Sequence, residues 1–214
     1  MTFTSSNLSP PLTTLPSMSP PMRLLVCSIG NPGAYLNTLH SAGHTILTRL
    51  AQSLSYPPFE RSRSHANGLL SSPGGGDHGV TLWQSPTLMN VSGPAVAAAW
   101  RQFLRDGPGD TSSSPPARLV VVHDELESAL GDVRIKRGDA SPKGHNGLKS
   151  IREQMRALDY TRIAVGIGRP SSRDPDVVAA YVLRKMTPAE RLKIEGAAAR
   201  VEVELRRLAE DLGG

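Results

Sequence analysis

The sequence predicts a single α/β domain in which helices cover both faces of a mixed β-sheet. Strand-like and helix-like segments alternate along the chain, which is the order that layered α/β folds require. Two neighbouring strand segments are separated only by a short turn, so this pair should be antiparallel and the sheet mixed. The length of 214 residues suits one domain with a sizeable core.

The first half of the domain should contain three strands and two helices. The strands are expected at 24–29, 69–70 and 80–83. The first is a buried apolar run, and the other two flank a turn rich in Ser, Pro and Gly, as in a hairpin. The first helix, 40–54, has apolar residues at helical spacing. The second, 95–104, is expected to be capped by Ser92.

The second half should contain three further strands and two helices. The strands are expected at 119–122, 133–136 and 163–167. The middle one alternates as an edge strand does, and the segment 148–158 forms an amphipathic helix. The last helix has a complete start signal, with Thr187 as the cap, Pro188 at the first helical position and Glu190 closing a capping box. It should run to about Leu212.

Two segments are expected outside this core. Residues 1–22 are rich in Ser, Thr and Pro and contain no charged residue, which predicts a disordered tail before a domain at 23–214. The tail is acid-poor, as a mitochondrial presequence is, but it has no Arg and does not decide targeting. The segment 106–116, rich in Gly, Ser and Pro, should be a surface loop.

Hydropathy and cysteine content limit the compartments in which the protein is expected. No apolar run approaches the roughly 18 residues of a membrane span, so a soluble protein with no membrane partner is expected. Cys27 is the single cysteine, so no internal disulfide can form. This favours a reducing compartment, either the cytoplasm or the mitochondrion. The apolar neighbours of Cys27 indicate a core residue instead of a nucleophile.

Positive charge is concentrated in one stretch. The formal net charge is +5, yet the stretch from Arg134 to Arg173 alone holds ten Lys and Arg against three Asp and Glu. Such a surplus is expected of a surface that meets phosphates, although a solvated face would also explain it.

Polar clusters follow the ends of the predicted strands, where ligands bind in open α/β sheets. They stand at Gly30–Gly33, Met89-Asn90 and His123–Glu125, and a fourth, His145-Asn146, opens a helix. Each alone has an ordinary explanation as a turn, a helix cap or a surface charge. Their common placement along one rim of the sheet predicts a functional site.

Five motifs, in order, resemble those of the bacterial-type peptidyl-tRNA hydrolase family over residues 23–212. They are Gly30-Asn31-Pro32-Gly33 with Tyr35 and His40-Ser41-Ala42-Gly43, Pro86 to Gly93 around Met89-Asn90, Val122-His123-Asp124-Glu125-Leu126, Gly144-His145-Asn146-Gly147, and Val165 to Pro170. Three departures are visible. Ser41 stands where the family has Asn, the segment between Asn31 and His40 is one residue shorter, and Asp139–Lys143 has a form associated with eukaryotic members.

The resemblance implies a three-layer sandwich and an esterase that cuts the peptide from peptidyl-tRNA, recycling tRNA from stalled translation. The implied catalytic residues are His40, Asp124 and Asn31. With an ordinary pKa of about 6.5, His40 suits a general base acting on water. Asp124 can hold one imidazole nitrogen, and the neutral amide of Asn31 can stabilise an oxyanion.

Further residues are implied to bind the substrate. Those at the reaction centre are Tyr35, Met89, Asn90, His145 and Asn146. The sequence leaves open which asparagine faces the oxyanion and which holds the peptide, and His145 could stack on or bond to the terminal nucleotide. Cations of the basic stretch should hold the tRNA backbone, namely Lys136, Arg137, Lys143, Lys149, Arg152 and Arg173. A monomer without metal or cofactor is expected, because the sequence has no metal-ligand spacing and no phosphate-cradling loop with its lysine.

Two other functions compete with this one. A non-catalytic RNA-binding relative would keep the fold and the basic face but could lose the site, and the intact set of Asn31, His40 and Asp124 favours the enzyme. A dinucleotide-binding enzyme would need Gly-x-Gly-x-x-Gly after the first strand. Here Pro32 removes a backbone amide that the phosphate would use.

Overall fold

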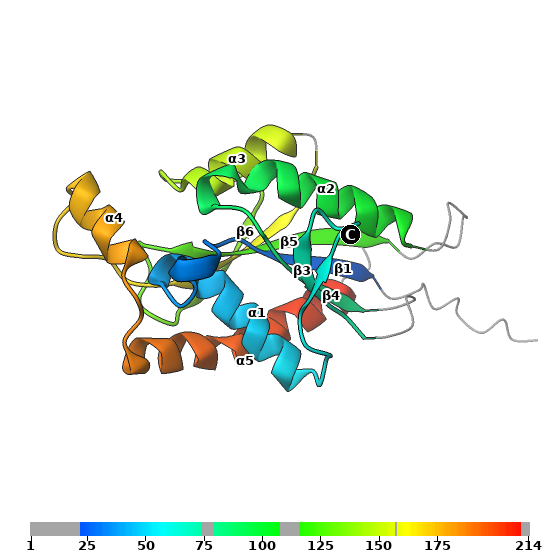
Figure 1. The fold of residues 1–214 in the computed structure, drawn as a ribbon, viewed down its shortest axis with the longest axis horizontal. Helices are drawn as coiled ribbons and strands as arrows, with labels where there is room; N and C mark the ends of the chain where they lie inside the picture. Colours follow the sequence, from blue (N-terminus) through cyan, green and yellow to red (C-terminus); the bar gives the residue numbers. More distant parts are fainter. Residues whose placement is uncertain (1–21, 74–78, 108–115, 157, 211–214) are drawn as a thin grey trace, which may run out of the picture.

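A computed structural model describes residues 22–73, 79–107, 116–156 and 158–210 of the chain (Figure 1). Its strands are β1 Arg23–Ser28, β2 Glu60–Ser62, β3 Gly68–Ser71, β4 Val80–Gln84, β5 Ala117–Glu125, β6 Val133–Arg137 and β7 Thr161–Gly166. Its α-helices are α1 Ala42–Ser53, α2 Ser92–Arg105, α3 Asn146–Gln154, α4 Pro175–Leu183 and α5 Pro188–Glu210. Three short 3-10 helices are η1 Gly33–Tyr35, η2 Leu39–Ser41 and η3 Met89–Val91.

The strands form one mixed sheet in the order β2-β3-β4-β1-β5-β7-β6. The four central strands β4, β1, β5 and β7 are parallel, whereas β2, β3 and β6 join antiparallel at the two sides. The expected hairpin of β3 and β4 and the expected edge strand β6 are both confirmed. Because the central strands run the same way, their carboxyl ends meet along one rim of the sheet.

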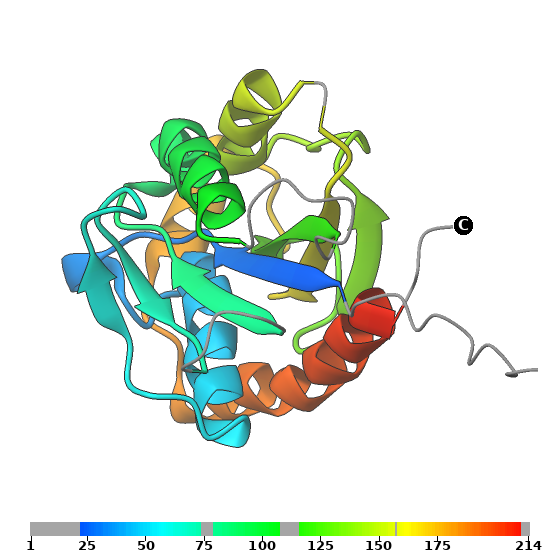
Figure 2. The same cartoon turned by 90° about the vertical axis from the view of Figure 1, so that its right-hand side faces the viewer.

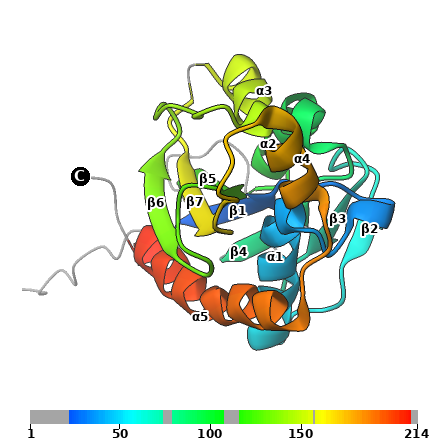
Figure 3. The same ribbon diagram turned by 90° about the vertical axis from the view of Figure 1, so that its left-hand side faces the viewer.

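Helices cover both faces of the sheet, as predicted, and give three layers (Figures 2 and 3). Alternate residues of a strand point to opposite faces. Leu24 and Val26 therefore pack in the core under α1 and α5, and Leu25 and Cys27 pack in the core under α2 and α3. Cys27 is fully buried, which confirms its prediction as a core residue.

Helix α4 stands apart from both layers, beyond the carboxyl ends of the parallel strands (Figures 1 and 3). It was not predicted, although Asp174 supplies an N-cap whose carboxylate accepts the N–H of Asp176 at 2.8 Å and that of Val177 at 3.3 Å. No side chain of α4 is buried. The short edge strand β2 was also missed.

Two helix boundaries differ from the prediction. Ser92 does not cap α2, because it is the first helical residue and its Oγ donates back to the carbonyl of Met89 at 2.9 Å. Helix α3 ends at Gln154, so Leu158 lies outside it.

The capping box of α5 is confirmed. The N–H of Thr187 donates to Glu190 at 2.8 Å, and the N–H of Glu190 donates to Thr187 Oγ1 at 3.2 Å. The predicted end of this helix at Leu212 lies outside the described residues.

The predicted tail lies outside the described residues up to position 21, as do 74–78 of the hairpin turn and 108–115 of the predicted loop. Met22, the last residue assigned to the tail, is 5% exposed and packs in the core. Within the described part of the chain, no helix has both the length and the apolar character to cross a membrane.

Candidate active site

A cavity of about 690 Å³ opens at the rim where the central strands end. Every residue predicted for the reaction centre lines it, namely Asn31, Tyr35, His40, Met89, Asn90, Asp124, His145 and Asn146. They come from separate elements that the parallel sheet brings together. The loop after β1 carries Asn31, η3 after β4 carries Met89 and Asn90, and the end of β5 carries Asp124.

Glycines let two elements approach closely enough to complete the site. A Cβ at Gly43 would lie 2.7 Å from the carbonyl oxygen of Val122, so α1 rests directly on β5 and holds His40 beside Asp124. A Cβ at Gly147 would lie 2.7 Å from Met89 Sδ, so α3 starts in contact with η3. Larger side chains at either position would separate these elements.

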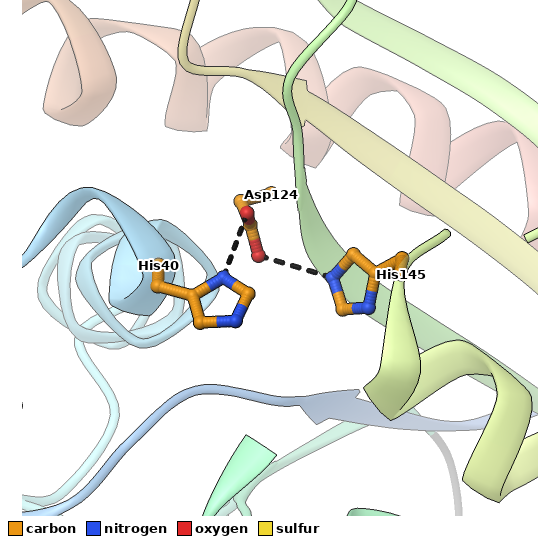
Figure 4. Close-up of side chains that lie close together, drawn as sticks. All are labelled: His40, Asp124 and His145. Carbon is orange, nitrogen blue, oxygen red and sulfur yellow. Dashed lines mark hydrogen bonds and ion pairs between the residues drawn. The ribbon is translucent and has the colours of Figure 1, made fainter. Parts of the chain in front are cut away.

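Asp124 is the centre of the site. Its side chain is only 4% exposed and lies between two imidazoles (Figure 4). Oδ2 is 2.9 Å from Nδ1 of His40, and Oδ1 is 3.1 Å from Nε2 of His145. Both carboxylate oxygens are therefore held by histidines.

The electrostatics favour a charged carboxylate beside a basic imidazole. Burial by itself raises the pKa of Asp124, but the charges and hydrogen bonds of His40 and His145 dominate and hold it well below its ordinary value. Burial lowers the pKa of His40, and the charge and hydrogen bond of Asp124 more than offset this effect. The pKa of His40 consequently lies above its ordinary 6.5.

Asn31 is buried, and its amide orientation is determined by the backbone. The N–H of Met89 donates to Oδ1 of Asn31 at 2.8 Å. Since this N–H can only donate, Oδ1 must face it, and the NH2 group of Asn31 is left for the cavity. Asn31 thus presents a neutral hydrogen-bond donor to the cavity that His40 also lines.

Ser41 holds the loop that carries Asn31. Its buried Oγ accepts the N–H of Asn31 at 3.0 Å and donates to the carbonyl of Tyr35 at 3.0 Å. Sequence reasoning noted Ser41 only as a departure from a motif. Its complete burial next to two site residues identifies it as a support for the loop.

The other predicted substrate ligands differ in exposure. Asn90 and Asn146 are exposed, so their amides are free to meet a ligand, although Lys149 Nζ donates to Oδ1 of Asn146 at 3.1 Å. Tyr35 is 44% exposed, whereas Met89 is 1% exposed and forms part of the floor. The far wall is apolar and comes from α4, through Val178, Ala179 and Val182.

His123 is a buried site residue that the sequence analysis placed in a polar cluster but to which it gave no role. Its Nδ1–H donates to the backbone carbonyl of Asp124 at 2.6 Å, and its ring lies edge-on to that of His145. Burial and the neighbouring His145 lower its pKa to about 3, so His123 is neutral at physiological pH. Its position directly before Asp124 was the only signal in the sequence.

The ligand atoms of His40, Asp124 and His145 lie within 4.8 Å of one another, a spacing that could also admit a metal ion. The hydrogen bonds argue for another use of this group. Both imidazole nitrogens that face the carboxylate already bond to it, so a metal would have to replace two hydrogen bonds.

The predicted tRNA-binding cations do not form one uniform surface. Lys143 and Arg173 are exposed at the wall of the cavity, and Lys136 lines it in an ion pair with Glu125. Arg137, also exposed, pairs with Asp139 at 3.2 Å. The remaining two, Lys149 and Arg152, are exposed on α3.

Arg162 belongs to the same basic stretch but is 1% exposed. Its guanidinium donates to the carbonyls of Arg137 at 3.1 Å and Ala140 at 3.0 Å. Arg162 therefore anchors the loop after β6 instead of offering charge to a partner.

Comparison with known proteins gives the family and the fold. A family model described as peptidyl-tRNA hydrolase matches residues 25–212. A peptidyl-tRNA hydrolase of Kineococcus radiotolerans is 41% identical over 174 residues, which are 78% of this chain and 81% of the relative. One from Mycobacteroides abscessus is 37% identical over 171 residues, covering 78% and 79%. The crystal structure of the peptidyl-tRNA hydrolase from Acinetobacter baumannii superposes with a TM-score of 0.68 at 28% identity, covering 87% of this chain and 88% of that one.

Proposed function

The chain belongs to the peptidyl-tRNA hydrolase family, and on this premise we propose that His40, Asp124 and Asn31 hydrolyse the ester that joins a peptide to tRNA. One observation carries the assignment of these residues. An imidazole is fixed by a buried carboxylate at the wall of a cavity of about 690 Å³ whose other walls present asparagine amides. Ester hydrolysis needs a base for water and donors for an oxyanion, and this cavity offers both.

His40 acts as the general base through Nε2. Because Nδ1 donates its proton to Asp124 at 2.9 Å, the lone pair is on Nε2. Nε2 takes a proton from water as the water oxygen attacks the carbonyl carbon of the ester. The ribose oxygen leaves when the tetrahedral intermediate collapses and receives the proton back from the imidazolium.

Asn31 donates to the carbonyl oxygen as it becomes negative. Its NH2 group is turned to the cavity by the bond between Oδ1 and the N–H of Met89, so it needs no reorganisation during the reaction. The exposed amides of Asn90 and Asn146 hold the peptide, and Tyr35 and Met89 line its path. The apolar wall of α4 supports placing peptide side chains on that side of the cavity.

The tRNA backbone is held by the basic stretch. Lys143 and Arg173, which line the cavity, bind the phosphates nearest the ester, and Arg137, Lys149 and Arg152 contact phosphates farther along. Lys136 contributes less, because it is paired with Glu125.

The catalytic group comes from one chain, so we propose that a monomer suffices. The free buried thiol of Cys27 supports a reducing compartment, the cytoplasm or the mitochondrion. A non-catalytic RNA-binding role is not favoured, because His40 is hydrogen-bonded to Asp124 and Asn31 lines the same cavity.

The test is the release of the acylated amino acid from N-acyl-aminoacyl-tRNA, with unblocked aminoacyl-tRNA as the control substrate. His40→Ala should lose most of kcat and bind tRNA nearly as well as the wild type, since no phosphate contact is removed. Turnover by the folded His40→Ala protein near the wild-type rate would rule out His40 as the base.

A further inference from the structure

Three imidazoles surround Asp124, each bonded to a different oxygen. His40 bonds to Oδ2, His145 to Oδ1, and His123 to the backbone carbonyl. Only the first of these bonds belongs to the general base. We propose that His145 is a positioning residue that clamps Oδ1 of Asp124, so that Oδ2 stays directed at His40. This inference rests on the proposed function, in which His40 and Asp124 work as a pair.

The backbone of α3 determines which nitrogen of His145 carries the proton. His145 is the N-cap of α3, and its Nδ1 accepts the N–H of Leu148 at 3.3 Å. A backbone N–H can only donate, so Nδ1 is unprotonated. The ring proton of the neutral imidazole is therefore on Nε2, where it is donated to Oδ1 of Asp124 at 3.1 Å.

Both nitrogens of His145 are consequently engaged within the protein. A substrate can meet only the face of this ring, and not its hydrogen-bonding atoms. The ring centroids of His145 and His40 are 5.5 Å apart, and those of His145 and His123 are 5.3 Å apart. Partners of this kind orient the groups that they bond to, which is how outer residues tune a reactive one.

The titratable groups that face His40 are few. Asp124 contacts it from β5, and His145 faces it from the start of α3. His123 contacts the ring of His145 edge-on and stays neutral, whereas Glu125 is paired with Lys136. The charge that His40 senses most closely is therefore that of Asp124, which His145 partly neutralises by its hydrogen bond.

Two substitutions separate the two bonds of His145. Asn places a polar atom near the position of Nδ1, and Gln places one near that of Nε2. His145→Asn should keep the helix cap, for which Asn is well suited, but lose the donor to Asp124. His145→Gln should keep a donor to Asp124 and lose the cap.

We expect His145→Asn to lower kcat about tenfold with little change in KM. The acid limb of its pH–rate profile should move to higher pH. Without the hydrogen bond from residue 145, the charge of Asp124 acts on His40 alone and favours its protonated form. The Tm of His145→Asn should fall as well, because Oδ1 of the buried carboxylate loses its donor. His145→Gln should recover most of the lost kcat and return the acid limb of the pH–rate profile to its wild-type position. Its Tm should fall by about 2–4 °C, because the helix cap is lost.

The titration of the His40 ring should be followed by NMR in the substrate-free proteins. This readout does not depend on turnover, so failure of the ester hydrolysis assay in the wild type would count against the proposed function alone. The inference is supported if the His40 titration moves upward in His145→Asn and returns in His145→Gln.

Two outcomes would overturn the inference. If both variants raise KM and leave the titration of His40 unchanged, His145 binds substrate and does not position Asp124. If the variants change only Tm, His145 is a helix cap without an effect on the base.

Discussion

Replacing Asp124 with Asn should disable the base through its tautomer. The Asn side chain keeps the shape of Asp but offers one acceptor oxygen where the carboxylate offered two. His145 must keep that oxygen, because the N–H of Leu148 fixes its proton on Nε2. The NH2 group of the new amide then faces Nδ1 of His40, so His40 carries its proton on Nε2 and cannot accept one from water.

The expected loss follows from the removal of the base. A correctly placed base with the wrong tautomer costs roughly 10³–10⁴ in kcat, or about 4–5.5 kcal/mol of transition-state stabilisation. Asp124→Ala imposes no tautomer on His40 and should lose less than Asp124→Asn. The measurement is single-turnover hydrolysis of N-acyl-aminoacyl-tRNA, with thermal melting to show that each variant is folded.

A double variant tests whether His145 is the reason that Asp124→Asn gives His40 the wrong tautomer. In His145→Asn the constraint on the amide of residue 124 is removed, so Asp124→Asn can turn its oxygen to His40. The double variant should therefore retain more activity than the product of the two single losses. The reasoning would be refuted if Asp124→Asn kept kcat within about tenfold of the wild type, since general-base catalysis is worth at least about 10².

Three further predictions concern the tRNA, stability and metal. Lys143→Glu combined with Arg173→Glu should raise KM and reduce the slope of log affinity against log salt by about two, because each phosphate contact contributes about one; an unchanged slope would mean that these residues do not hold the backbone. The free energy of unfolding should fall as pH drops from 6.5 to about 4. Burial lowers the pKa of His44 to about 4, so in this range the unfolded chain binds a proton at His44 and the folded protein does not. His44 contributes about 3 kcal/mol to this fall, and His123 acts in the same direction. A free energy of unfolding that stays constant between pH 6.5 and about 4 would contradict the lowered pKa of both histidines. Dialysis of the enzyme against a chelator should leave kcat unchanged, and a loss reversed by a divalent ion would contradict the expectation of a reaction without metal.

Local patterns were sufficient for most of the sheet and for the membership of the site. Apolar runs located the central strands, and the cap sequence at Thr187 located the start of α5, because these signals depend on neighbouring residues. Parallel strands then imply a common rim, which is why the clusters at Asn31, Asn90 and Asp124 could be assigned to one site before their contacts were known.

Weak local signals explain the elements that were missed. Strand β2 has only three residues and pairs at the edge of the sheet, so it lacks a readable alternation. Helix α4 is apolar on several sides and fully buries none of its side chains, because it lines the cavity and meets the core only through the half-buried Tyr181 and Val182. Its sequence therefore has no single apolar stripe, and only the cap at Asp174 marked its start.

The roles of individual charges were decided by tertiary structure. The basic stretch was visible as a surplus of charge, yet only packing shows that Arg162 is buried on backbone carbonyls and that Lys136 is paired with Glu125. The sequence likewise allowed a helix cap at His145-Asn146, which Nδ1 of His145 provides, but it cannot show that Nε2 bonds to Asp124. Hydrogen bonds act over about 3 Å, and residues far apart in sequence reach that distance only when the sheet and α3 are packed together.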